Sequence, residues 1–297
     1  MSASIGIAAH NEAANIGRLL AALTGDAADD GLVSEIIVVA SGCTDRTERI
    51  IGDFAAVDRR VRLLAQPRRE GKAAAVNLLI GQAAEDVLLL VSADTLPAPG
   101  AVRALLAPFA DPAVGVTAGR IVPRNPDRGL MGSYVNLFWR LHHQVALRGF
   151  KAGEAVAFRR VIAAIPDDTA TDETWIVRLV EGRGLGARYV PEAVFFNRGP
   201  ATVGEFLTVR RRQLAGYHHL RTLRPGWELP GTMDNPLVLR LMAGEVRRAP
   251  FRAPLLAGAM LLEALARALA RYDYFIAGRN PHIWEMAGSA RRPDCGP

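Results

Sequence analysis

Residues 87–94 read VLLLVSAD, an uninterrupted apolar run that ends in a carboxylate. An apolar run of this length is typical of a strand covered on both faces, as in the middle of a parallel sheet. Asp94 follows this strand directly, where burial of a carboxylate is costly unless a cation or a helix start compensates it. The stretch therefore predicts a central strand with a charged group just beyond its carboxyl end.

Three more strands are predicted before this one, over 5–9, 35–40 and 61–65, each followed by a helical pattern. The first of these helices is expected to begin at Asn11, as its cap. Alternation of strands and helices at this spacing is typical of parallel βαβ units, whose ligands bind beyond the carboxyl ends of the strands. The residues just after those ends are 11–12, 41–45, 69–72 and 92–94.

The second half of the chain mixes predicted helices with shorter strands. Residues 225–236 are rich in proline and glycine, which is typical of a loop. The remaining expected elements are helices over 131–147, 171–182 and 202–223, and strands over 152–158, 188–190 and 194–196.

Composition narrows the class of protein. The chain has 297 residues, 50% hydrophobic and 22% charged, as is ordinary for a folded globular protein. No signal peptide is predicted at the start of the chain. The two cysteines, Cys43 and Cys295, form neither a metal-binding spacing nor a disulfide framework, so we expect a cytoplasmic protein.

Positive charge is concentrated in the last third of the chain. Residues 201–297 hold 14 Lys and Arg against 8 Asp and Glu, which accounts for the whole net charge of +6. Such a surface suits anionic lipid, a phosphorylated substrate or nucleic acid, and equally a solvated helix face.

Two features of the predicted sheet edge suit a phosphate and a metal ion. Asp94 would bind a hard cation such as Mg²⁺ or Mn²⁺ together with diphosphate oxygens, or it would cap the helix expected near 97–109. Gly71 and Lys72 open a helix, where backbone N–H groups, the helix dipole and an ammonium favour a phosphate.

Two charged clusters in the second half allow a chemical and a structural interpretation. Asp172 and Glu173 begin a helix, so one of them would deprotonate a substrate hydroxyl, or both would complement the helix dipole beside Thr171. The three arginines at 210–212 would bind a diphosphate bidentately or form a charged helix face.

Seven segments, in this order, resemble the conserved motifs of the family 2 glycosyltransferases, and they extend over roughly residues 3–220. Their order along the chain is far more specific than any one of them. The segments are 7–12 (IAAHNE), 38–47 (VVASGCTDRT), 70–77 (EGKAAAVN), 92–94 (SAD), 153–160 (GEAVAFRR), 171–173 (TDE) and 210–216 (RRRQLAG).

The resemblance implies a GT-A fold, an α/β architecture in which helices flank a Rossmann-like mixed sheet. A catalytic domain over 1–223 would consist of a nucleotide-sugar-binding half, 1–119, and an acceptor half, 120–223. Residues 224–297 would form a loop and a helical C-terminal extension.

The resemblance also implies a site and a reaction. Mg²⁺ or Mn²⁺ would bind Asp94, with His218 as a further candidate ligand, and Arg212 would help neutralise the leaving nucleoside diphosphate. Glu173 or Asp172 would deprotonate an acceptor hydroxyl, with inversion at the sugar. The partners would be a nucleotide-sugar donor and a hydroxyl acceptor of unknown identity, without nucleic acid. The implied nucleotide-sugar-binding residues are Ala9, Asn11, Glu12, Ser41, Lys72, Ser92, Ala93, Asp94 and Arg212.

Several positions depart from the family motifs. Ala40 and Ser41 replace two acidic residues that usually help hold the base and ribose, and Ser92 replaces the first Asp of the DxD motif. Val209 and Gln213 replace the Gln and Trp of the QxxRW motif, which indicates a non-processive enzyme because that Trp binds the growing chain.

The apolar stretch 253–270 bears on location. Glu263, Arg267 and Arg271 follow at four-residue spacing and would form one polar stripe on a helix. With the arginine cluster at 247–252, this pattern predicts a helix lying in the inner face of the cell membrane, close to a lipid-linked or membrane-proximal acceptor. Alternatively, the helix packs on the catalytic domain or forms a homodimer.

Two other function classes share part of this pattern. A nucleotidyltransferase has a parallel sheet and a metal-binding Asp, but it usually carries a Gly-rich basic loop after the first strand, which residues 8–15 lack. A catalytically silent nucleotide-sugar-binding protein would be consistent with the acidic residues missing at positions 40, 41 and 92.

Overall fold

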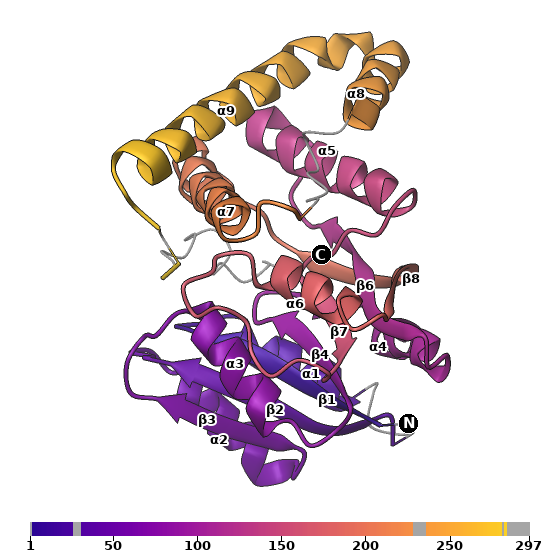
Figure 1. Cartoon of the computed structure of the whole chain (residues 1–297), viewed down its shortest axis with the longest axis vertical. Helices are drawn as coiled ribbons and strands as arrows, with labels where there is room; N and C mark the ends of the chain where they lie inside the picture. The colour runs from indigo at the N-terminus through magenta and orange to yellow at the C-terminus, as the bar shows by residue number, and fades with distance from the viewer. Residues whose placement is uncertain (1, 26–30, 228–235, 281, 284–297) are drawn as a thin grey trace.

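The computed structural model describes residues 2–25, 31–227, 236–280 and 282–283. Within these ranges, helices flank an eight-stranded mixed sheet, and a layer of long helices lies beyond one end of it (Figure 1). Cys295 and most of the loop predicted at 225–236 lie outside the described residues.

The first half of the chain forms the parallel part of the sheet, as predicted. Strands β1 (Ala3–Ala9), β2 (Val33–Ser41), β3 (Val61–Gln66) and β4 (Val87–Ser92) run parallel in the spatial order β3-β2-β1-β4. The apolar run at 87–92 is confirmed as a central strand. The connecting helices are α1 (Ile16–Gly25), α2 (Thr47–Val57) and α3 (Lys72–Gln82).

The sheet separates two hydrophobic cores. In β2, Ile36 and Val38 contribute to the core shared with α1 and α2, whereas Ile37 and Val39 contribute to the core that contains Leu79 of α3. Successive side chains of a strand point to opposite faces, so a strand covered on both sides is apolar at every position.

The chain after β4 adds four strands and makes the sheet mixed. β7 (Ala155–Arg159) pairs antiparallel with β4 and with β6 (Val114–Pro123), β6 pairs parallel with β8 (Gly186–Asn197), and β5 (Leu96–Pro97) closes the edge. The adjoining short helices are α4 (Ala101–Leu106), η1 (Ala107–Ala110) and α6 (Asp172–Glu181).

The sequence-based prediction of the chain after β4 was incomplete. β6 and the helix α8 (Pro236–Arg248) were not anticipated. The two short strands predicted at 188–190 and 194–196 are one strand, β8, whose register against β6 shifts between Val190 and Val194. The shift lets a single strand look like two separate apolar runs in the sequence.

The helical layer consists of α5 (Gly129–Ala146), α7 (Val203–Leu223), α8, η2 (Pro250–Arg252), α9 (Ala253–Arg271) and the single turn η3 (Tyr272–Ile276). In Figure 1, α9 runs along the outside of α5 and α7. A separate apolar core joins these three helices. It contains Tyr134, Phe206, Leu214, Ala259 and Ala266.

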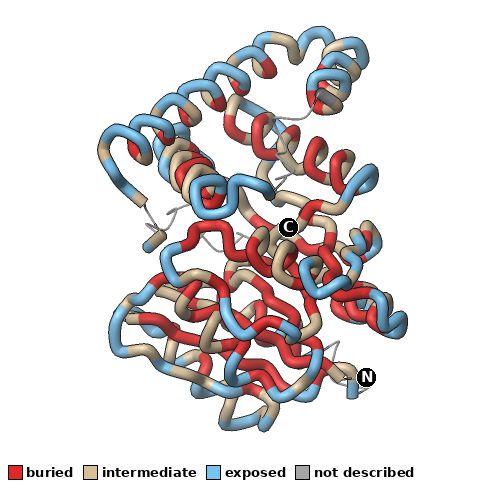
Figure 2. Tube along the Cα trace, in the orientation of Figure 1, coloured by how far each residue is buried: buried red, intermediate tan, exposed pale blue. Residues whose placement is uncertain are grey.

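Helix α9 has one buried and one exposed face. Glu263 of the polar stripe is 4% exposed and Arg267 is half-buried, but Arg271 is exposed; Leu261 on the other face is 72% exposed. Figure 2 shows this outer side of α9 as largely exposed. The segment thus packs on the domain through Glu263 and its buried alanines, and its leucine-rich face stays uncovered. Pro250–Ile276 is long and apolar enough to cross a membrane, by length and composition alone.

Candidate active site

The carboxyl ends of β1, β2 and β4 meet at one edge of the sheet, where Ala9 pairs with Ala40 and Ala8 with Ser92. A cavity of about 560 Å³ lies at this edge, with α5, α7 and α9 contributing to its other wall. Most of the predicted site residues line it, as the strand-end argument expected. They are Ala9, Glu12, Ser41, Lys72, Ser92, Ala93, Asp94, Asp172, Glu173, Arg212 and His218.

Asn11 lies beside this cavity but does not appear in its lining. Its backbone adopts the left-handed conformation, with a φ of 55°. Its side-chain oxygen accepts a hydrogen bond from the backbone N–H of Thr44 at 2.7 Å, which holds the loop after β2. The prediction that Asn11 caps the first helix is wrong, because α1 begins only at Ile16.

Glu12 and Ser41 are buried at the floor of the cavity. The Glu12 carboxylate accepts a hydrogen bond from the Asn15 side chain at 2.8 Å. The backbone N–H of Glu12 donates a hydrogen bond to the Thr47 hydroxyl at 2.7 Å. The Ser41 hydroxyl accepts a hydrogen bond from the backbone N–H of Glu70 at 3.3 Å. Ser41 therefore links the end of β2 to the segment that leads into α3.

Lys72 connects the start of α3 with the two carboxylates at the start of α6. Gly71 allows the turn into α3, because its φ of 97° disfavours residues with a side chain. The Lys72 ammonium lies 2.7 Å from a carboxylate oxygen of Asp172 and 2.9 Å from one of Glu173. Burial alone would lower the pKa of Lys72, but the two carboxylates raise it above its ordinary value. The lysine is therefore charged at neutral pH.

The two carboxylates on α6 have different environments. Burial and the neighbouring Glu173 charge raise the pKa of Asp172 to about 6. Burial opposes ionisation of Glu173 as well, but Lys72 outweighs it and lowers the pKa of Glu173. The Asp172 side chain is 3% exposed and that of Glu173 is 29% exposed. Glu173 is therefore the more exposed of the two carboxylates and the one whose ionisation Lys72 favours more strongly.

Asp94 shares the cavity with a carboxylate that the sequence analysis missed, Glu154. Burial raises the pKa of Asp94, against the nearby charges of Lys72 and Arg212. Burial and the charge of Asp94 raise the pKa of Glu154 to about 7. Glu154 directly precedes β7, so the antiparallel pairing of β7 with β4 brings it to the strand end that carries Asp94.

The three consecutive arginines of α7 separate into different roles. Arg210 and Arg211 each form a two-bond ion pair with a carboxylate of the C-terminal segment, Arg210 with Glu263 and Arg211 with Asp273, at 2.7–2.8 Å. Both Arg210 and Arg212 line the cavity. Burial lowers the pKa of Arg212 to about 10, although carboxylates of the site favour its charge.

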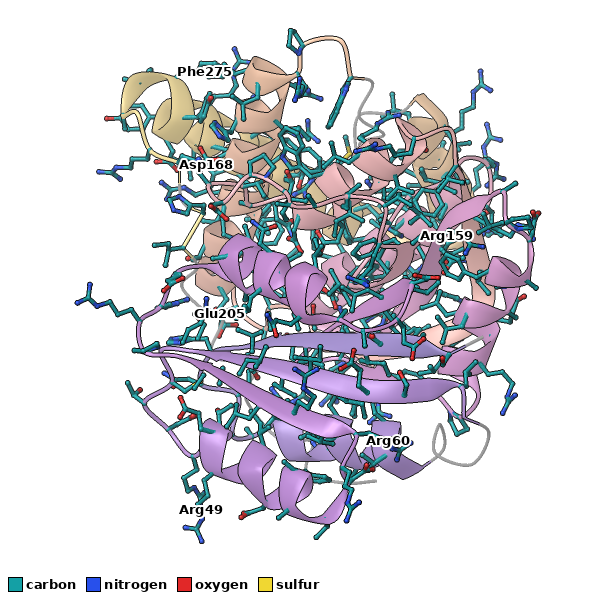
Figure 3. The ribbon with its side chains drawn as sticks, turned by 60° about the horizontal axis from the view of Figure 1, so that its bottom comes forward. Arg49, Arg60, Arg159, Asp168, Glu205 and Phe275 are labelled. Carbon is teal, nitrogen blue, oxygen red and sulfur yellow. The ribbon has the colours of Figure 1, made fainter. Side chains whose placement is uncertain are left out.

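His218 lines the cavity six residues after Arg212 on α7. Its ring packs against those of Tyr274 and Phe275, at centroid distances of 6.1 and 5.1 Å. The next residue, His219, lies 2.9 Å from a carboxylate oxygen of Asp168. Figure 3 shows Asp168 and Phe275 on the same side of the molecule, where the C-terminal segment approaches the loop before α6.

An aromatic group on α5 completes the wall opposite the sheet. Phe138, Trp139 and His142 line the cavity. Burial and the nearby Lys151 lower the pKa of His142 to about 3, so this imidazole is neutral. The aromatic residues of this helix were visible in the sequence, but nothing in their spacing assigned them to the site.

Oxygen ligands for a divalent cation are present at Asp94, with Glu154 nearby. Among the described residues, no group of three or more His, Cys, Asp or Glu side chains is arranged to hold a metal ion. The half-buried carboxylate of Asp94 nevertheless fits Mg²⁺ or Mn²⁺, because Mg²⁺ in particular is usually held by one or two carboxylates together with substrate phosphates.

Comparison with known families supplies the deciding observation. Residues 4–165, more than half of the chain, match the family described as glycosyl transferase family 2. The chain belongs to glycosyl transferase family 2. The prediction of a glycosyltransferase is thereby confirmed at the level of the family.

A relative among the curated proteins gives a second comparison. An N-acetylglucosaminyltransferase of Sinorhizobium fredii is 26% identical over 231 residues, which cover 70% of this chain and 52% of that relative. The chain therefore spans about half the length of this curated relative.

Solved structures confirm the predicted GT-A fold. A mannosyltransferase from Pyrobaculum calidifontis, in complex with GDP-mannose and Mn²⁺, aligns with a TM-score of 0.62 at 22% identity, over 94% of this chain and 86% of that one. Glucosyl-3-phosphoglycerate synthase from Mycobacterium tuberculosis, in complex with Mn²⁺, UDP and its product, aligns with a TM-score of 0.52 at 18% identity, over 73% and 79%.

Proposed function

We propose that this family member is an inverting, metal-dependent and non-processive glycosyltransferase, which moves a sugar from a nucleotide-diphosphate donor to an acceptor hydroxyl. The observation that carries the proposal is the meeting of Lys72, Asp94 and Arg212 with the carboxylates of Asp172 and Glu173 in one cavity. Cavities that hold small molecules have volumes of about 300–1,000 Å³, so a volume of about 560 Å³ suits a nucleotide sugar.

The donor diphosphate belongs between the start of α3 and α7. Lys72 and the helix N-terminus supply positive charge on one side, and Arg212 supplies a bidentate guanidinium on the other. A divalent cation held by Asp94 and the diphosphate would add charge stabilisation to the leaving group. GDP-mannose and UDP-glucose both occur in the structural relatives, so both bases are candidates for this donor.

Glu173 is the proposed catalytic base. It takes the proton of the acceptor hydroxyl while the hydroxyl oxygen forms a bond to the anomeric carbon. The bond from that carbon to the diphosphate oxygen breaks, and the nucleoside diphosphate leaves with the electron pair. Attack from the opposite face inverts the anomeric centre. Lys72 keeps Glu173 ionised and oriented, because its ammonium lies 2.9 Å from a Glu173 oxygen.

The proposal of a non-processive enzyme rests on α7. Val209 and Gln213 line the cavity at the positions where processive members carry Gln and Trp. The Gln213 side chain accepts a hydrogen bond from Arg210 at 3.2 Å, and it offers no ring on which a growing polymer would stack.

Thermal unfolding with a panel of nucleotide sugars tests the function, since a ligand that binds only the folded state raises the melting temperature. We expect a GDP- or UDP-sugar to raise it in the presence of Mn²⁺, with weaker effect in EDTA. NMR of the product should show the anomer opposite to that of the donor. Donor binding without turnover would identify a silent binding protein, and pyrophosphate release from a nucleoside triphosphate would identify a nucleotidyltransferase.

We also propose that α9 attaches the enzyme to the inner face of the cell membrane, with the exposed leucines facing lipid. The proposal is supported by Leu261 and Leu265, which are 72% and 46% exposed, and by the arginine cluster at 247–252 beside them. Apolar burial and attraction of basic residues to anionic lipid would act together. A homodimer through the same face is the competing proposal.

A further inference from the structure

We propose that the acceptor carries a phosphate group and that Arg267 and Arg271 of α9 bind it. This inference rests on the proposed function and names the class of acceptor: an alcohol that also bears a phosphate ester. Both arginines line the same cavity as Glu173 and Asp94, although α9 begins 72 residues after α6 ends in the sequence.

The two arginines share one face of α9, because residues four apart are neighbours on a helix. The guanidinium of Arg267 is held in place by Glu263, at 3.0 Å, and that of Arg271 lies 6.0 Å from the ring centroid of Phe275. Contacts of this kind orient the two cations, so less conformational freedom is lost when they bind an anion.

The charge distribution in the cavity favours a phosphate at this wall. Its acidic lining residues lie at the strand ends and on α6, whereas α7 and α9 contribute five arginines and no Asp or Glu to the lining in the part of the chain that the structure describes. Glu263 lies behind this wall and its single negative charge is shared by Arg210 and Arg267. The wall therefore keeps a positive excess beyond what Arg212 offers to the donor.

Binding of an anionic acceptor requires this excess of positive charge on the α7 and α9 wall. Asp94, Glu154 and Glu173 would repel a second anion in the cavity, and cations on the opposite wall offset that repulsion. Phe138 and Trp139 provide apolar surface in the same cavity, which suits the uncharged part of such an acceptor. A phospholipid headgroup and a soluble phosphate ester both present this chemistry.

Calorimetric titration with glycerol 3-phosphate tests the assignment. The protein is first saturated with Mn²⁺ and with GDP or UDP, so that the probe cannot occupy the diphosphate site. We expect Arg271→Glu to weaken binding of glycerol 3-phosphate about tenfold or more, as loss of a charge-assisted hydrogen bond would. Arg49→Glu is the matched control, because it makes the same charge change at an exposed side chain on α2, outside the cavity lining.

A second variant and a lipid probe complete the experiment. Arg267→Gln should also weaken glycerol 3-phosphate binding, and its melting temperature shows whether it folds. Co-sedimentation with phosphatidylcholine vesicles, with and without phosphatidate, distinguishes the source of the phosphate. Binding to glycerol 3-phosphate that depends on Arg271 indicates a soluble ester, and phosphatidate binding that depends on Arg271 indicates a lipid headgroup.

Four results would overturn the inference. These are an equal loss in Arg49→Glu, no binding of either phosphate probe, phosphate binding that Arg271→Glu leaves unchanged, or weaker binding of the nucleoside diphosphate itself in Arg271→Glu. If the wild-type protein binds nucleoside diphosphate but neither phosphate probe, the inference alone fails. If it binds no nucleoside diphosphate, the proposed function fails with it.

Discussion

Individual residues of the site owe their properties to groups that are distant in sequence. Lys72 and Glu173 are separated by 101 positions, yet their side chains lie 2.9 Å apart. In the same cavity, the charge of Asp94 raises the pKa of Glu154. A divalent cation or the ammonium of Lys72 offsets the negative charge of these carboxylates. The donor and its metal ion should therefore bind together.

Asp94→Ala should abolish the Mn²⁺-dependent part of nucleotide binding while the chain still folds, because the substitution removes the proposed metal ligand. Titration calorimetry with GDP or UDP, with Mn²⁺ and with EDTA, measures the effect. Asp53→Ala, at an exposed carboxylate on α2, is the control and should bind like the wild type. Normal Mn²⁺-dependent binding by Asp94→Ala would show that the metal site lies elsewhere.

Glu173→Gln should lower the transfer rate by about 10²- to 10⁴-fold, the usual contribution of a general base, and should leave donor binding within severalfold. Single-turnover transfer and nucleotide titration separate the two effects. Asp172→Asn is the comparison, since this buried side chain contacts Lys72 as well. An active Glu173→Gln beside an inactive Asp172→Asn would reverse the assignment.

The stability of the metal-free protein should depend on Glu154. Its pKa rises from 4.5 to about 7 on folding, so its stabilising contribution is full below pH 4.5 and is lost as the pH rises through 7. Glu154→Gln carries no titrating carboxyl at this position, so its free energy of unfolding does not fall in this way. Relative to the wild type, the free energy of unfolding of Glu154→Gln should therefore rise by about 1–3 kcal/mol between pH 4.5 and 8.

Urea unfolding in EDTA at pH 5 and pH 8 measures this difference. Glu192→Gln, at an exposed position on β8, is the control and should follow the wild type at both pH values. Equal stability changes at both pH values in Glu154→Gln would contradict the prediction.

At the scale of elements, α7 and α9 act as one unit. Two ion pairs join them, Arg210 with Glu263 and Arg211 with Asp273 of the following turn, and the Tyr134 hydroxyl donates to Glu263 at 3.1 Å. The two arginines beside Arg212 are thus held by the C-terminal segment. This segment therefore positions the helix that carries the proposed diphosphate ligand.

Glu263→Gln should destabilise the protein by about 3 kcal/mol, because it leaves the buried Arg210 without its counter-charge. Urea unfolding measures the loss. The double variant Arg210→Met, Glu263→Leu should recover most of it, since a buried ion pair replaced by apolar residues is often neutral. A double variant as unstable as Glu263→Gln would mean that packing, rather than the unpaired charge, causes the loss.

At the scale of the whole molecule, the cavity lies between the strand ends and the helical layer. The exposed face of α9 lies on the outside of that layer (Figures 1 and 2). Glu263 of α9 faces the protein, and Leu261 faces outward. This arrangement would let the enzyme rest on a membrane while the inner side of the same helix contributes to the acceptor wall.

Leu261→Asp should weaken binding to vesicles that contain anionic lipid, because it places a charge on the most exposed leucine of α9. Co-sedimentation at low and high salt measures the binding, which salt should also weaken. Val57→Asp, at an 84% exposed apolar residue on α2, is the matched control. Absence of vesicle binding, together with a stable dimer that Leu261→Asp dissociates, would support the homodimer instead.

Local sequence patterns were sufficient to predict strands β1 to β4 and the segments after their carboxyl ends that carry Ser41, Lys72 and Asp94. Each βαβ unit is local, its apolar periodicity is set by its own buried faces, and its handedness is nearly invariant. Ligand groups at parallel strand ends therefore follow from the pattern without knowledge of long-range contacts.

Only the tertiary structure decided which charged side chains belong to the cavity. Residues 210–212 are equivalent in the sequence, but successive helix positions point about 100° apart, so each arginine meets a different neighbour. Glu154 joins the site only because β7 runs antiparallel to β4. The inward orientation of Glu263 likewise depends on the docking of α9 against α7, a contact between segments about 50 residues apart that local periodicity does not encode.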